Sequence, residues 1–249
     1  MQVHPFAGPP LRNLRPITLP FPSSPTTQNR QSMLSWLIRT ARSSIGRKAF
    51  VALTGLALVG FLVVHLAGNL TFFADSEGVA FDHYAETLES NPLLPLAELG
   101  LLVLFLVHIV MAVRLTFDNK KARPTPYMVK KSHGARTPGS RTMIMTGIVI
   151  LLFLVLHLAH FRLQQGEGVS FAALVKFELS KPLAAGAYVV GILALGLHLS
   201  HAIPSALQSL GLSHPKYTPM VRVGGLGLAI ILTVGFLMFP ILVFFGGNS

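Results

Sequence analysis

The chain has 249 residues, of which 51% are hydrophobic and 12% are charged, and it contains no cysteine. A soluble domain carries about 25% charged residues, so this composition excludes an ordinary soluble protein and indicates a membrane protein. The absence of cysteine excludes disulfides, cysteine-ligated iron–sulfur clusters and covalently attached haem. The formal net charge of +11 would suit a nucleic-acid-binding protein, but the distribution of the basic residues, described below, points elsewhere.

The N-terminal 45 residues differ from the rest of the chain. They are rich in proline, serine and threonine and contain no long apolar run. A segment of this kind cannot bury enough apolar surface to fold. We therefore expect a disordered tail over residues 1–45, with Met33 as an alternative start of translation, and a single membrane domain over residues 46–249.

Apolar residues are concentrated in five blocks, each close to the length of about 20 residues that spans the hydrocarbon core of a bilayer. The blocks cover residues 49–74, 93–117, 142–161, 182–210 and 223–246. The predicted fold is an all-α membrane protein in which five transmembrane helices form a bundle.

Charged residues are divided between the two ends of these helices. Sixteen of the 20 basic residues precede the first block or lie in the connections between blocks two and three and between blocks four and five. Six acids lie on the opposite side, five of them in the first connection and one near the start of the second block: Asp75, Glu77, Asp82, Glu86, Glu89 and Glu98. The positive-inside rule then places the N-terminus in the cytoplasm and the C-terminus outside. The basic surface is expected to meet lipid headgroups and a cytoplasmic protein partner, and not nucleic acid.

Four of the five blocks contain a histidine in an otherwise apolar segment: His65, His108, His157 and His198. An ionisable residue inside a membrane is costly and indicates a functional site. Neutral imidazole binds iron, and one histidine from each of two facing helices can hold a haem inside a bundle. Four such histidines suggest two haems, which must be of the non-covalent b type because cysteine is absent.

Counting residues from the charged ends of the helices gives the depth of each histidine, since an α-helix rises about 1.5 Å per residue. His65 lies 17 positions beyond Lys48, and His157 lies 16 beyond Arg141. His108 lies 12 positions before Lys120, and His198 lies 12 before Leu210, so these two share a lower level. Depth therefore pairs His65 with His157 and His108 with His198.

Several polar residues of the spans are compatible with more than one role. A membrane histidine can serve in packing or in a proton path. His160 and His201 each lie three positions after a proposed ligand and could replace it. Arg114 and Arg162 lie five or six positions beyond a ligand, where they could bind haem propionates or extend to the interface.

Several segments resemble a known family, the five-helix, di-haem cytochrome b subunits of succinate:quinone oxidoreductases of the b558 type. The matching segments are SSIGRKAFVALTG, FLVVHLAGN, LVHIVMAVRLTF, TGIVILLFLVLHLAHFRL, GAYVVGILALGLHLSHAIPSALQSLGL and PKYTPMVR. The resemblance covers residues 44–246. It implies that His65 and His157 bind the outer, distal haem b and that His108 and His198 bind the inner, proximal one. His160 and His201 are departures from the family pattern.

The resemblance also implies partners and a substrate. A flavoprotein subunit would oxidise succinate, an iron–sulfur subunit would pass electrons to this anchor, and a quinone, commonly menaquinone, would receive them. This chain has no succinate-oxidising site of its own. The candidates for quinone or proton chemistry are His160, Glu77, Glu86, Glu98 and His83. The alternatives are an anchor for a hydrogenase or formate dehydrogenase, and a haem-free proton-coupled transporter.

Overall fold

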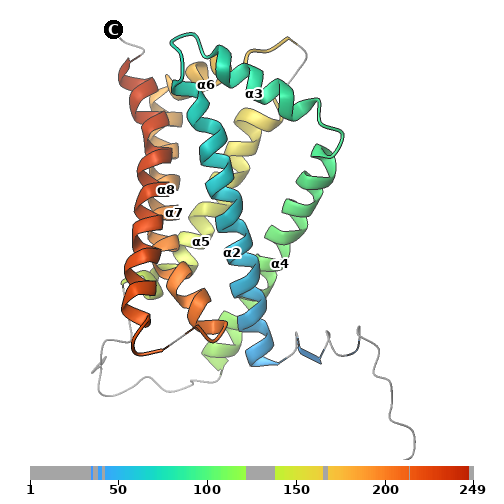
Figure 1. Ribbon diagram of the computed structural model, residues 1–249, viewed down its shortest axis with the longest axis vertical. Coiled ribbons are helices and arrows are strands. Elements are labelled where there is room, and N and C mark those ends of the chain that lie inside the picture. The colour runs from blue at the N-terminus through green and yellow to red at the C-terminus, as the bar shows by residue number, and fades with distance from the viewer. Residues whose placement is uncertain are drawn as a thin grey trace, which may run out of the picture.

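The computed structural model describes residues 43–121, 138–164, 168–212 and 214–246, together with Ser35, Arg39 and Thr40. Its described part is helical, and five helices are long and apolar enough to cross a membrane. They are α2 (Ser44–Asn69), α4 (Leu94–Lys121), α5 (Pro138–His157), α7 (Pro182–Ser209) and α8 (Thr218–Gly246) (Figure 1). The prediction of an all-α protein with five spans is confirmed. The predicted tail, Met33 and most of the connection between the second and third spans lie outside the described residues.

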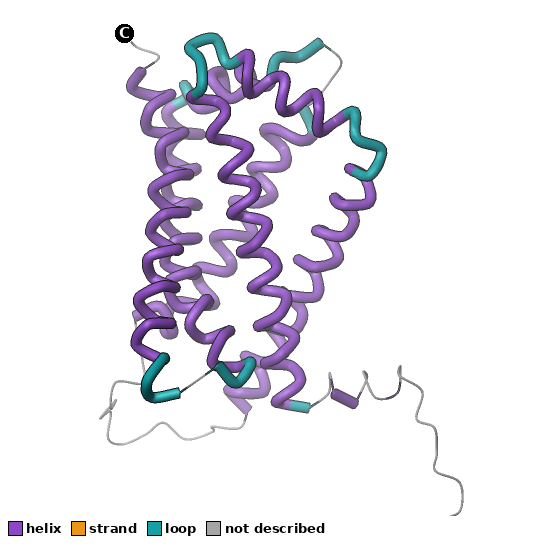
Figure 2. Tube along the Cα trace, in the orientation of Figure 1, coloured by secondary structure: helices purple, strands orange, loops and turns teal. Residues whose placement is uncertain are grey.

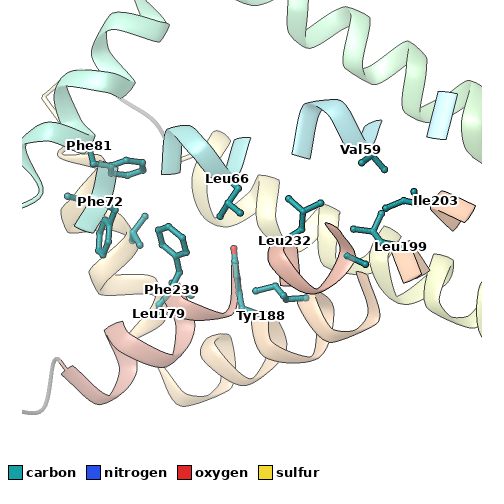
Figure 3. Packing of buried hydrophobic residues seen from close by; sticks show 14 residues of the cluster. Val59, Leu66, Phe72, Phe81, Leu179, Tyr188, Leu199, Ile203, Leu232 and Phe239 are labelled. Atoms are coloured by element: carbon teal, nitrogen blue, oxygen red, sulfur yellow. The ribbon is translucent and has the colours of Figure 1, made fainter. Parts of the chain in front are cut away.

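Helix α7 lies at the centre of the packing and contacts α8, α5 and α2. Its buried side chains include Tyr188, Ile192 and Leu199, which meet residues of the neighbouring helices such as Leu66 and Leu232. Figure 3 shows the Tyr188 side chain between Phe239 and Leu232, with Leu66 nearby. The best-packed part of the bundle is therefore formed by α2, α5, α7 and α8.

Helix α4 packs against α2 and stands apart from α7 and α8 (Figure 1). No residue in the apolar window of α4 is buried within the chain. Three polar contacts attach this helix to the bundle: Glu98 to Arg162, His108 to Thr54, and Asp118 to Arg47. The rest of the α4 surface is apolar and therefore suits contact with lipid. The backbone needs no other partner there, because a helix makes its backbone hydrogen bonds internally.

Two short helices cover one end of the bundle, which we call the upper end: α3 (Val79–Glu89) and α6 (Phe171–Leu179) (Figure 2). Neither helix was expected, because their segments were interpreted as connecting loops. A 3₁₀ turn, η1 (Leu70–Phe73), leads from α2 toward α3, and the π-helix η2 (Leu158–Arg162) follows α5. His83, which lies between the first two predicted spans, is an exposed residue of α3.

Side-chain caps explain why these short helices form. The carboxylate of Asp75 accepts hydrogen bonds from the backbone N–H groups of Glu77, Gly78, Val79 and Ala80 at the start of α3. These bonds hold the pKa of Asp75 below its usual value. Ser170 caps α6 by accepting from the N–H of Ala173 at 3.0 Å. Asp82 joins the two helices, because its carboxylate accepts from Ser170 Oγ at 2.6 Å and from the N–H of Ala172 at 2.8 Å.

Candidate functional site

The structure brings the rings of His65 of α2 and His157 of α5 next to each other near the upper end of the bundle. Their ring centroids are 5.9 Å apart, and the ring planes are perpendicular, at 89°. Aromatic side chains surround this pair, with Phe61 stacked on His65 and Phe161 beside His157. Both rings are partly buried. The two histidines that counting along the helices places at one depth are therefore direct neighbours in the structure.

His108 of α4 and His198 of α7 form a second pair, farther from the upper end. The two side chains lie near each other in the space between α4 and α7. Each ring also contacts a threonine of another helix. His108 Nδ1 lies 3.1 Å from Thr54 Oγ1 of α2, and His198 Nδ1 lies 3.1 Å from Thr146 Oγ1 of α5.

The upper pair fits the demands of a bis-histidine haem. A nitrogen–metal bond of about 2 Å on each side of an iron separates the two ligating nitrogens by about 4 Å. Ring centroids 5.9 Å apart are compatible with that separation. The described residues contain no group of three or more His, Cys, Asp or Glu arranged to hold a metal ion. Two imidazole rings from two different helices are the donor set that suits a haem held inside a bundle.

The helix geometry changes directly after His157. Residues Leu158–Arg162 form the π-helix η2. A π-bulge inserts an extra residue into a helical turn and is frequently found at functional sites. Here it rotates His160 toward α6 and α7, where its ring stacks on Tyr188 with centroids 5.9 Å apart. The sequence held no signal for this change, because LVLHLAHFRL has an ordinary helical pattern.

His160 belongs to a buried polar group that includes Glu178 of α6 and Tyr188 of α7. His160 Nδ1 lies 3.6 Å from Glu178 Oε2, and Lys181 Nζ lies 2.8 Å from Glu178 Oε1. Glu178 is only 4% exposed. Tyr188 also lies beside His157, with ring centroids 6.1 Å apart. Sequence reasoning missed both residues. A single acid within an apolar segment, FAALVKFEL, was the available signal for Glu178.

The other residues that the sequence suggested for quinone or proton chemistry are not part of this buried group. Glu77, Glu86 and His83 are exposed at the upper end. Glu98 forms a two-bond ion pair with Arg162, whose Nε and Nη2 donate to its carboxylate oxygens at 2.7 and 3.1 Å. The structure thus gives Arg162 a protein partner, which neither of the two roles suggested by the sequence, propionate binding or extension to the interface, had included. Arg114 is exposed on α4.

The two additional histidines each lie close to one of the proposed ligands. His160 is within electrostatic reach of His157, and His201 is within electrostatic reach of His198. The ring next to His65 nevertheless belongs to His157. His157 is therefore the better placed of the two residues to share a ligand with His65.

Comparison with known proteins identifies a relative. Over 167 residues the chain is 30% identical to the succinate dehydrogenase cytochrome b558 subunit of Bacillus subtilis (strain 168). The match covers 65% of this chain and 78% of the relative. No family model and no solved structure matches the chain. The extent of this similarity, in a chain with five membrane-spanning helices, shows that the protein belongs to the family of succinate dehydrogenase cytochrome b558 subunits.

Proposed function

We propose that this chain is the haem-bearing membrane anchor of a succinate:quinone oxidoreductase, with residues 46–249 forming one di-haem domain. His65 and His157 would hold the distal haem b, and His108 and His198 would hold the proximal haem b. When bound, the haems supply one-electron transfer between the partner iron–sulfur subunit and a quinone. The observation that carries the proposal is the proximity of the His65 and His157 rings, 5.9 Å apart between two membrane helices.

The chain's own residues orient the ligands and exclude water. Neutral imidazoles provide the iron-binding nitrogens, and apolar helices hold them in a medium of low dielectric. Phe61, Phe153, Phe161 and Phe236 pack around the upper pair. Burial and hydrogen bonding of the ligands are the means by which a protein sets the potential of a haem. Arg114 and Arg162 stay candidates for contacts to the propionates.

Quinone chemistry is proposed at the upper end, beside the distal haem. Menaquinone is the proposed substrate. His160, Glu178 and Tyr188 bring imidazole, carboxyl and phenol groups together next to His157, so proton donors are available where the quinone would be reduced. His83, Glu77, Glu86 and Glu98 are proposed as groups that exchange protons between this site and the surface.

The charge distribution supports an orientation with the upper end outside the cytoplasm. Asp75, Asp82 and Glu86 lie at the upper end, whereas Arg47, Lys121 and Arg222 lie near the opposite ends of α2, α4 and α8. A basic cytoplasmic surface is suited to docking the iron–sulfur and flavoprotein subunits through electrostatic complementarity. Lipid headgroups would meet the same surface.

The proposal is tested by purifying the chain from membranes together with its bound proteins. We expect b-type absorption from two haems per chain, co-purification of a flavoprotein and an iron–sulfur subunit, and succinate-dependent reduction of a menaquinone analogue. A colourless chain produced with ample haem would overturn the haem assignment. A coloured chain with other partners would indicate the anchor of a different respiratory complex.

The ligand pairs are tested by substitution. His65→Ala and His157→Ala should each remove the same haem signal, and His108→Ala and His198→Ala should each remove the other, because each iron loses one of two axial ligands. Redox titration of the absorbance resolves the two signals. If the His65 and His108 variants lost the same signal, the pairing would be wrong.

A further inference from the structure

A Thr–Gly dipeptide occurs at the same place in two of the spans. Thr54 and Gly55 precede His65 in α2, and Thr146 and Gly147 precede His157 in α5, with eleven positions from threonine to histidine in both cases. Eleven residues make about three turns of an α-helix, so threonine and histidine share a face. Each of these helices therefore presents a haem-ligand candidate near the upper end and a Thr–Gly pair three turns below it.

The single hydroxyl proton of each threonine is already used in a hydrogen bond to a backbone carbonyl. Thr54 Oγ1 donates to the carbonyl of Phe50 at 2.6 Å, and Thr146 Oγ1 donates to the carbonyl of Thr142 at 3.0 Å. A hydroxyl has one proton and two lone pairs, so the oxygen is left as an acceptor. The Nδ1 atoms of His108 and His198, both 3.1 Å from these oxygens, must then be the donors.

Backbone carbonyl groups strengthen this assignment. Each threonine hydroxyl also lies near a second carbonyl, with Thr54 Oγ1 3.3 Å from the oxygen of Val51 and Thr146 Oγ1 3.1 Å from the oxygen of Met143. Val51 and Met143 each precede the respective threonine by three positions. A backbone carbonyl can only accept a hydrogen bond. With the proton held on Nδ1, the lone pair is on Nε2 of both rings.

The glycines lie directly against the same two rings. A Cβ atom at Gly55 would be 3.2 Å from His108 Cε1, and one at Gly147 would be 3.9 Å from His198 Cε1. In each Thr–Gly pair, the threonine supplies a hydrogen-bond acceptor. The glycine has no side chain and so leaves the space that the histidine ring occupies. His65 of the upper pair is held differently, since the side-chain amide of Asn69, on the same helix, lies 3.3 Å from His65 Nδ1.

We propose that Thr54 and Thr146 are positioning residues for the proximal haem, each fixing the tautomer and orientation of a histidine on a neighbouring helix so that Nε2 faces the iron. This inference rests on the proposed function of His108 and His198 as ligands. Groups that hold the second nitrogen of a metal-binding histidine fix its tautomer and raise its basicity, and their loss typically costs about 10- to 100-fold in metal affinity.

The test uses the full chain carrying Thr54→Val together with Thr146→Val. Valine keeps the shape of threonine and removes the acceptor oxygen. We expect haem affinity at the proximal pair to fall about 10-fold or more and the potential of any proximal haem that remains to rise, because its ligands become less basic. The distal haem serves as an internal control for folding and should keep its spectrum and potential. Thr54→Ser with Thr146→Ser should restore the wild-type values.

A matched control is Thr116→Val in α4, whose hydroxyl makes the same type of bond to a carbonyl four residues earlier, at 2.9 Å. This variant should leave both haems unchanged. The positioning role is overturned if the double valine variant keeps its proximal haem affinity and potential, or if it loses both haems equally. If the wild-type chain itself binds no proximal haem, the assignment of the ligands fails instead. Titration of the haem-free protein with haem, followed by redox potentiometry, separates these outcomes.

Discussion

Gly55 and Gly147 occupy corresponding positions in two helices, but the rings that they face lie at different distances. A Cβ at Gly55 would come within 3.2 Å of His108 Cε1, closer than an ordinary contact, whereas at Gly147 the distance to His198 Cε1 would be 3.9 Å. Because side chains in close-packed interiors respond to the addition of even one methyl group, the two positions should respond differently to alanine.

We expect Gly55→Ala to displace the His108 ring and to reduce the proximal haem content per chain, while Gly147→Ala keeps the haem content of the wild type. Alanine also favours the helical conformation over glycine by about 1 kcal/mol, so Gly147→Ala should not lower the melting temperature. Haem absorbance per chain and thermal unfolding measure the two effects. Equal losses of proximal haem in both variants would contradict a steric role specific to Gly55.

The histidines and their threonine partners were not equally visible in the sequence. A polar ring in an apolar span is conspicuous, so His65, His108, His157 and His198 could be singled out and paired by depth. Thr54 and Thr146 are ordinary residues of membrane helices. Their contacts to His108 and His198 span 54 and 52 positions, and no local pattern indicates a partner at such a separation. Glu178 differs, because a single acid within the apolar segment FAALVKFEL is a local signal, although it indicates no partner.

At the level of elements, the five spans were predictable because length and apolar composition decide them. The short helices α3 and α6 were not. They are 11 and 9 residues long, which is marginal for an isolated helix in water, and their stability depends on caps and on each other. The bonds from Ser170 and Ala172 to Asp82 join residues about 90 positions apart, so the sequence pattern alone favoured a loop.

Asp75 supplies the cap of α3, and its contribution should depend on pH. Its pKa is lowered by hydrogen bonds from the backbone N–H groups at the start of α3, first of all that of Ala80. A lowered pKa in the folded state means that ionised Asp75 stabilises the fold at pH values above the usual 3.8. This contribution is lost as the pH falls through the lower, folded-state value.

Asp75→Asn should therefore be less stable than the wild type near neutral pH, because asparagine loses the charge and one acceptor oxygen. The difference in melting temperature between the two proteins should shrink as the pH is lowered toward 3. Thermal unfolding of both proteins across this pH range provides the measurement, with Glu86→Gln, an exposed acid of the same helix, as control. A difference that grows on acidification would be inconsistent with capping by the carboxylate.

At the level of the whole molecule, the proposed function separates three tasks along the helix axes. The buried group of His160, Glu178 and Tyr188 lies nearest the upper end, followed by the His65–His157 pair and then by the His108–His198 pair. Electrons that enter at the opposite, basic end would meet the proximal pair before the distal pair and would reach the quinone last. Electrons that follow this order move outward from the cytoplasm only if the upper end faces outward. The charge distribution predicts that orientation.

The absence of cysteine makes that orientation directly measurable, because one introduced cysteine is then the sole thiol of the chain. Ser90→Cys places it at the end of α3, at the upper end, and Ser209→Cys places it at the end of α7, at the opposite end. Both serines are exposed, and the substitutions are nearly isosteric. A membrane-impermeant maleimide should label Ser90→Cys in right-side-out vesicles and Ser209→Cys only in inside-out vesicles. The reverse pattern would place the quinone group on the cytoplasmic side and would invert the proposed path of the electrons.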